Sequence, residues 1–182
     1  MVNDCTHGGR VYRLSHLNPS VISVTRAATE TYPAKTVRFF VTYSNHCFTK
    51  HFAENDDETL LYEDSRRYFC TERYAGSLLL PGLIPILIEN NILLGLTMKE
   101  RRESFFYLEE HHMGVTYRLF FDISSSNHPA SDIRLKVTTA YPEDDWAADV
   151  GVHARFNIWR VIDARMNGEK LATKEQQRRR RR

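Results

Sequence analysis

The stretch Val115-Thr116-Tyr117-Arg118-Leu119-Phe120-Phe121-Asp122-Ile123 decides the fold class of this chain. Apolar side chains stand at every second position and mostly polar ones between them, which is the period of a strand with one buried face. The same alternation recurs in the stretches Thr36 to Phe48 and Asp132 to Tyr141. A shorter strand is predicted over Ser104 to Leu108. These segments indicate one sheet with a buried face and a basic, exposed face.

Helical spacing of apolar residues appears in two other segments. Asp64 to Asn90 is predicted to form helices that pack on the sheet, and Val152 to Met166 has the spacing of an amphipathic helix. Strands and helices that alternate irregularly along the chain are typical of the α+β class. We therefore predict a single α+β domain over residues 1–168, with a largely antiparallel sheet and helices packed on one face.

Positive charge is concentrated at the C-terminus, where Arg178 to Arg182 are all arginine. The formal net charge of the 182 residues is +2, so removing these five charges leaves −3 for the remainder. That remainder lacks the overall basic character of tight nucleic-acid binders. Residues 169–182 are predicted to be a disordered basic tail that folding does not need. The tail either contacts phosphates or only keeps the protein in solution.

Cysteine usage and hydropathy set expectations for the compartment. The three cysteines are far apart, and no N-terminal apolar run resembles a signal peptide, which favours a reducing, cytoplasmic setting. The longest apolar stretch, Leu78 to Ile88, is much shorter than the roughly 20 residues that a membrane span needs. No membrane association is expected.

Two histidines lie where the early strand ends. His46 and His51 flank Cys47 and Lys50, and histidine is the side chain best suited to proton transfer near neutral pH. Acid–base catalysis or phosphate contact is one interpretation. A metal site that also uses Cys70 is another, although the spacing matches no strong zinc pattern. The third is an inert, half-buried strand end.

Two further positions are candidates for catalysis. His112 lies in a polar turn predicted over Glu109 to Gly114, where it is either functional or simply exposed. Tyr141 ends the third strand beside Pro142, so its hydroxyl either faces a substrate or closes the core. Neither alternative is decided by the sequence.

Three basic residues are candidates for phosphate binding. Arg66 shares a predicted helical stripe with Arg73, and Arg134 and Lys136 lie on the exposed face of the third strand. Pairing of Arg66 with neighbouring carboxylates is the alternative. With either interpretation, no metal ligand set is assigned.

The segments Tyr117 to Asp122 and Ile133 to Tyr141 resemble the small ribonuclease toxins of the RelE/BrnT type. In that family a strand of the form I-R-x-I-S-A-R follows a hydrophobic strand and a short loop. Here Thr139-Ala140 stands for the Ser-Ala step, and Tyr141 replaces the basic residue. The resemblance covers Thr36 to Tyr141 and implies catalysis by basic and polar side chains on a sheet face, without a metal.

These observations lead to two main functional hypotheses. The first is a metal-independent ribonuclease or RNA-binding protein, with no cofactor and with RNA as its partner. The second is a non-enzymatic interaction or accessory protein, such as one of a mobile genetic element, with a protein partner. A phosphate-cradling glycine loop and a nucleophile elbow are both missing from the sequence, which disfavours nucleotide hydrolysis and esterase chemistry.

Overall fold

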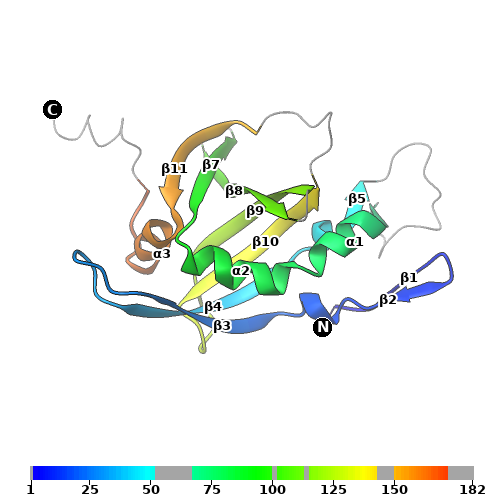
Figure 1. The fold of residues 1–182 in the computed structure, drawn as a ribbon, viewed down its shortest axis with the longest axis horizontal. Helices are drawn as coiled ribbons and strands as arrows, with labels where there is room; N and C mark the ends of the chain where they lie inside the picture. Colours follow the sequence, from blue (N-terminus) through cyan, green and yellow to red (C-terminus); the bar gives the residue numbers. More distant parts are fainter. Residues whose placement is uncertain (1, 52–66, 100–101, 113–114, 143–149, 172–182) are drawn as a thin grey trace.

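A seven-stranded sheet forms the centre of the protein (Figure 1). The computed structural model describes residues 2–51, 67–99, 102–112, 115–142 and 150–171. The strand order is β11-β7-β8-β9-β10-β4-β3, and β10 and β4 run parallel whereas the other neighbours run antiparallel. The strands are β3 (Ser20–Arg26), β4 (Lys35–Tyr43), β7 (Leu93–Lys99), β8 (Arg102–His112), β9 (Val115–Ser125), β10 (Ile133–Pro142) and β11 (Val152–Asn157).

Smaller elements surround the sheet. Two pairs of short strands are β1 (Cys5–His7) with β2 (Arg10–Tyr12), and β5 (Thr49–His51) with β6 (Arg67–Phe69). The helices are α1 (Thr71–Ser77), α2 (Leu80–Glu89) and α3 (Ile158–Met166), and short 3₁₀ turns cover Ser15–Leu17 and Asn45–Cys47. Asn91, in the left-handed conformation with φ 49°, turns the chain from α2 toward β7.

The core lies between one face of the sheet and the helices. Strand register places Phe106 opposite Phe121 and Phe121 opposite Val137, and all three side chains are buried. Helix α1 contacts β10, α2 contacts β3 and α3 contacts β9. The predicted α+β class, with a largely antiparallel sheet and helices on one face, is confirmed (Figure 1).

The predicted helix over Asp64 to Asn90 begins too early. Arg67–Phe69 is strand β6, and the helix begins at Thr71, while residues 64–66 lie outside the described part of the chain. The physical reason is pairing with β5: Lys50 lies opposite Tyr68, and the side chains of Arg67 and Phe69 are buried. Three residues are too few for a strand period to be recognised in the sequence.

The predicted helix over Val152 to Met166 is helical only from Ile158. Residues Val152–Asn157 form β11 and pair with β7 at the sheet edge. His153 and Arg155 are exposed on either side of the half-buried Ala154, which is the alternation of a strand. Apolar residues spaced by three and four positions across the junction of β11 and α3 therefore led to the prediction of a longer helix.

The polar turn predicted over Glu109 to Gly114 is also shorter than expected. Strand β8 continues through His112, and its register with β9 extends to the pair His112 and Val115. Residues 113–114 are not among those described. Cross-strand pairing, here Glu109 opposite Arg118, keeps this polar segment in the sheet.

The folded part of the chain reaches beyond residue 168. Gly168 has a φ of 67° and ends α3, as the Asn-Gly pair suggests. Leu171 then returns to the core, with only 6% of its surface exposed. The boundary expected between a domain at 1–168 and a tail at 169–182 remains a prediction for residues 172–182, which the structure does not describe.

Candidate functional site

Five basic side chains gather where β4 ends and its parallel pairing with β10 stops. We call His46, His51, Arg67, Arg73 and Lys136 the basic cluster. They come from the 3₁₀ turn after β4, from β5, β6 and α1, and from β10. Lys136 lies opposite Thr42 and is near enough to lower the pKa of His46. The fold thus brings together residues that are up to 90 positions apart in the sequence.

Backbone hydrogen bonds fix the turn that carries His46. The Ser44 amide donates to the Val137 carbonyl at 3.0 Å, which continues the parallel ladder by one step. The Ser44 hydroxyl accepts a hydrogen bond of 3.2 Å from the His46 amide, as a turn-capping side chain does. The His46 ring then lies with Nδ1 3.5 Å from the Thr139 hydroxyl, at the edge of hydrogen-bonding range.

Two guanidinium groups converge on one carbonyl oxygen. Arg67 Nη2 and Arg73 Nη1 donate to the Thr49 carbonyl at 3.0 and 2.9 Å. Arg67 is 4% exposed, and its Nε donates to the Thr49 hydroxyl at 2.8 Å. Within the described ranges, neither arginine forms a salt bridge with a carboxylate. Burial of a cation without a counter-ion is unfavourable, and the hydrogen-bond partners of these two groups in the described part of the chain are the neutral oxygen atoms of Thr49 and His46.

The two predicted histidines face each other across the site. The ring centroids of His46 and His51 are 6.4 Å apart, with planes at 62°. Burial lowers the pKa of His46 below its ordinary value, and the positive charges of Arg67, His51, Arg73 and Lys136 lower it further. His46 is therefore neutral at pH 7 and has a free nitrogen lone pair to accept a proton.

A small pocket opens beside the cluster. It has a volume of about 400 Å³ and is lined by Lys50, His51, Cys70, Glu72, Arg73, Tyr141 and Pro142. The Arg73 guanidinium lies 4.9 Å from the centre of the Tyr141 ring, a cation–π contact that holds both side chains in the wall. The pocket is large enough for a phosphate and part of its carrier.

Cys47 takes no part in this chemistry. Its thiol is fully buried and points to the Val137 carbonyl, with Sγ to oxygen 3.7 Å. Burial raises the pKa of Cys47 to about 12, so the reactive thiolate is not formed near neutral pH. No three side chains of the His, Cys, Asp and Glu types gather as metal ligands in the part of the chain that the structure describes.

Four of the seven predicted site residues come together here: His46, His51, Lys136 and Tyr141. Arg134 does not join them, because it lies two residues before Lys136 on β10, is exposed, and lies opposite Phe40 rather than the strand end. The backbone of His112 ends β8 two strands away from β10, but its side chain is outside the description. Arg66 likewise falls in the segment that is not described.

Sequence reasoning passed over Arg67 as a site residue and gave Arg73 only a share in a helical stripe. The predicted stripe of Arg66 and Arg73 assumed one helix through both, whereas β6 ends before α1 begins. The signal for Arg67 was the order Arg-Tyr-Phe, in which a strand turns the first and third side chains to the same side. The place of Arg67 in the site becomes visible only from the pairing of β6 with β5.

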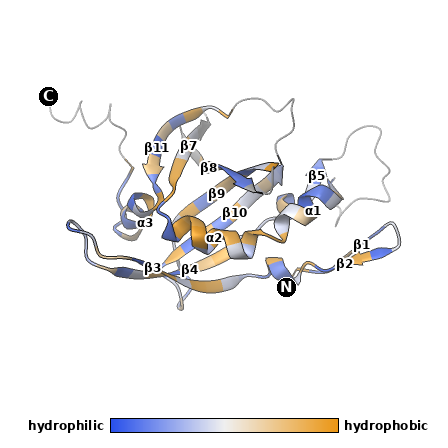
Figure 2. Cartoon of the chain, in the orientation of Figure 1, coloured by the Kyte–Doolittle hydropathy of each residue, from blue (hydrophilic) through white to orange (hydrophobic). Residues whose placement is uncertain are grey.

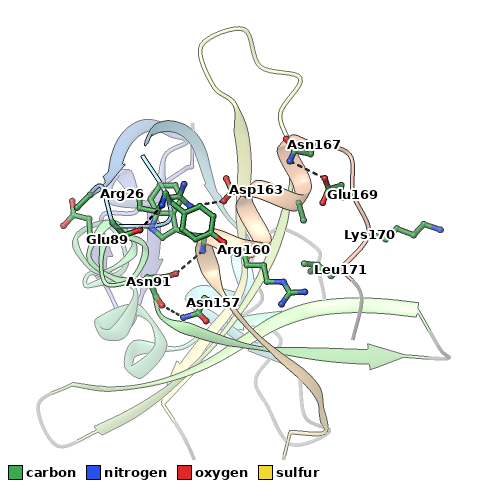
Figure 3. Close-up of a pocket in the computed structure, with 15 residues that line it drawn as sticks. Arg26, Glu89, Asn91, Asn157, Arg160, Asp163, Asn167, Glu169, Lys170 and Leu171 are labelled. Atoms are coloured by element: carbon green, nitrogen blue, oxygen red, sulfur yellow. Dashed lines mark hydrogen bonds and ion pairs between the residues drawn. The ribbon is translucent and has the colours of Figure 1, made fainter. Parts of the chain in front are cut away.

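A second, larger hollow of about 1000 Å³ lies at the other end of the molecule, between the end of β3 and α3 (Figure 3). Its central charges are already paired with each other. The Asp163 carboxylate accepts hydrogen bonds from Arg26 at 2.9 Å and Lys35 at 2.6 Å. Burial raises the pKa of Asp163, but these two hydrogen bonds outweigh it and the pKa is lowered. Because the Asp163 carboxylate already holds both cations, this hollow offers less to an ionic ligand than the basic cluster.

The fold and the basic cluster thus define an α+β protein with a cationic site where the parallel pairing of β4 and β10 stops. The chain belongs to the YjaZ family, whose sequence model matches residues 4–166. This match overturns the resemblance to the RelE/BrnT toxins, since the family that covers almost the whole fold is a different one. No match was found among curated proteins or among solved structures.

None of the helices described here is both long and apolar enough to cross a membrane. Helix α2, the most apolar of them in sequence, has 10 residues. Cys5, Cys47 and Cys70 are all free thiols.

Proposed function

We propose that the basic cluster binds the phosphodiester backbone of RNA and cleaves it without a metal ion. The observation that supports this best is the pair of guanidiniums, Arg67 and Arg73, that share the Thr49 carbonyl beside two facing histidines. Cations that pair with no carboxylate among the described residues suit a phosphate, and a pair of imidazoles supplies the two proton transfers that RNA cleavage needs.

The proposed reaction uses the RNA 2′-hydroxyl as its nucleophile. Neutral His46 removes the 2′-hydroxyl proton, and the oxygen attacks the adjacent phosphorus. The bond from phosphorus to the 5′-oxygen breaks, and the imidazolium of His51 gives its proton to that leaving oxygen. The products are a 2′,3′-cyclic phosphate and a 5′-hydroxyl end. Arg73 stabilises the charge that develops on the phosphoryl oxygens.

The assignment of roles follows from the surroundings of each ring. His46 is half-buried, and its lowered pKa keeps it in the basic form at neutral pH. His51 is exposed at the pocket wall, on the side from which a substrate enters. Arg67, buried behind the site, positions the Thr49 backbone and adds to the positive potential.

The test is cleavage of an end-labelled, mixed-sequence RNA in the presence of EDTA. We expect wild-type protein to cut it and His46→Ala to cut it about 10²–10⁴ times more slowly, the range for loss of a positioned base. His153→Ala is the matched control, because His153 is exposed on β11 at the opposite sheet edge and its loss leaves the site intact.

A DNA oligonucleotide of the same sequence tests the nucleophile, since it lacks the 2′-hydroxyl and must remain uncut. If wild-type protein leaves the RNA pool intact both with EDTA and with Mg²⁺, the proposed cleavage is wrong. RNA binding that persists under those conditions and is lost in Arg73→Ala would then favour the non-enzymatic alternative, in which the cluster only holds an anionic partner.

A further inference from the structure

The outer face of the sheet carries basic side chains next to the basic cluster. Of the elements that the structure describes, the helices pack on the opposite face, which holds the core. Arg134 and Lys136 each stand between two buried residues of β10, so their side chains project outward. Figure 2 shows this succession of hydrophilic and hydrophobic residues along β9 and β10. The basic cluster includes Lys136 but not Arg134, which has no role in the reaction proposed above.

Partly exposed aromatic rings lie on the same outer face. Phe120 stands between the buried Leu119 and Phe121 on β9, so its ring also projects outward. Its centroid is 6.3 Å from that of the Tyr141 ring on β10, and the planes of the two rings differ by only 14°. The Tyr107 ring, with its centroid 5.0 Å from that of Phe120, supports Phe120 from β8. This face therefore offers nearly parallel, half-buried rings beside its cations.

The positive charges on this face are available to a partner. Arg134 lies opposite Ser124 on β9 and Phe40 on β4, and Lys136 lies opposite Asp122 on β9. Within the ranges that the structure describes, neither Arg134 nor Lys136 forms a salt bridge. A ligand that complements this face combines negative charge with planar, stackable groups.

We propose that this face binds single-stranded nucleic acid and leads it to the basic cluster. Unpaired bases stack on aromatic side chains while arginine and lysine hold the phosphates, whereas a duplex keeps its bases stacked inside the helix. The face is continuous with the site, because Lys136 belongs to the basic cluster and Tyr141 lines its pocket. The inference rests on the proposed function and names its substrate as single-stranded RNA.

The test is fluorescence anisotropy of a labelled, single-stranded DNA oligonucleotide titrated with the full chain. DNA lacks the 2′-hydroxyl, so binding is measured apart from cleavage. Phe120→Leu keeps an apolar side chain but removes the ring, and we expect it to weaken binding about 5- to 100-fold, as the loss of one stacked base does. Binding of the same sequence as a duplex must not change in this variant, because paired bases do not reach the ring.

Tyr32→Leu is the matched control, since Tyr32 is 54% exposed and lies in the connection between β3 and β4, before β4 begins. This variant also loses a ring and must bind the single strand as the wild type does. An unchanged far-UV circular dichroism spectrum shows that each variant is folded.

Arg134→Gln gives a second measurement that does not depend on how Phe120 packs. Arg134 is exposed, and its loss is expected to reduce the slope of log affinity against log salt concentration by about 0.7, the value for one phosphate contact on a single strand. A wild type that does not bind the single strand, a folded Phe120→Leu protein that binds it as tightly as the wild type, or an unchanged slope in Arg134→Gln overturns the proposal. RNA that stays uncut while single-stranded DNA binds as expected would reject only the proposed reaction.

Discussion

Positive charges near His46 shift its pKa, so a titration of this ring measures the electrostatics of the site. Burial lowers its pKa first, and Arg67, His51, Arg73 and Lys136 lower it further. We predict that Arg73→Gln raises the pKa of His46 toward the ordinary value of about 6.5. The measurement is an NMR titration of the His46 ring protons. Arg134→Gln, which removes an exposed charge that does not act on His46, must leave the titration unchanged.

The same shift links folding to pH. Because the folded protein holds His46 with a lowered pKa, the unfolded chain binds the proton more readily between the two pKa values. The lowered pKa of His46 therefore costs no stability above about pH 6.5 and costs more as the pH falls below it. Arg73→Gln reduces this loss. An Arg73→Gln protein in which the His46 titration does not move would show that the guanidinium does not act on this ring.

At the scale of the element, one-sided burial decides what the sequence can predict. In Val115–Ser125 the alternate residues Leu119, Phe121 and Ile123 are buried, so β9 was recognisable from its own residues. Arg67–Phe69 is a strand only because Thr49–His51 pairs with it. The two segments are distant in the sequence, so the spacing of residues within either one does not predict the pairing. His46 and His51 were therefore found from the strand end that precedes them, whereas Arg67, 18 residues from its partner Thr49, was not.

Packing of α1 on β9 gives a prediction at the same scale. A Cβ on Gly76 would lie 2.5 Å from Cε1 of Tyr117, closer than atoms can approach without a shift. We predict that Gly76→Ala lowers the free energy of unfolding by about 1 kcal/mol, since overpacking of about 1–3 kcal/mol exceeds the helix-propensity gain of about 1 kcal/mol. Urea denaturation of the variant and the wild type measures the difference.

The control for this contact is the same substitution in a Tyr117→Ala background. With the ring removed, Gly76→Ala keeps only the gain in helix propensity and must stabilise the protein by roughly 0.5–1 kcal/mol. Equal effects of Gly76→Ala in both backgrounds would show that α1 does not press against Tyr117, and that the glycine is needed for another reason.

At the scale of the whole molecule, the C-terminal segment divides into a packed part and a charged part. Composition alone placed the boundary after Gly168, because the residues beyond it are mostly polar or charged. Leu171 is nevertheless buried, and the Glu169 amide donates to the Ala164 carbonyl at 2.8 Å, which leads the chain back over the end of α3. A single apolar residue among charges carries no period, so its docking could not be predicted from sequence.

This difference is measurable with two truncations that both remove the arginine run. A chain that ends at Ala172 keeps Leu171. A chain that ends at Gly168 loses this residue, and with it the free energy of about 1.5–3 kcal/mol that burying a leucine side chain contributes. We predict that the chain ending at Ala172 melts close to the full-length protein at moderate salt. The chain ending at Gly168 is expected to melt several degrees lower, at about 2–4 °C per kcal/mol. Differential scanning calorimetry compares the three proteins. Equal melting temperatures for both truncations would show that Leu171 contributes nothing and that the fold ends with α3.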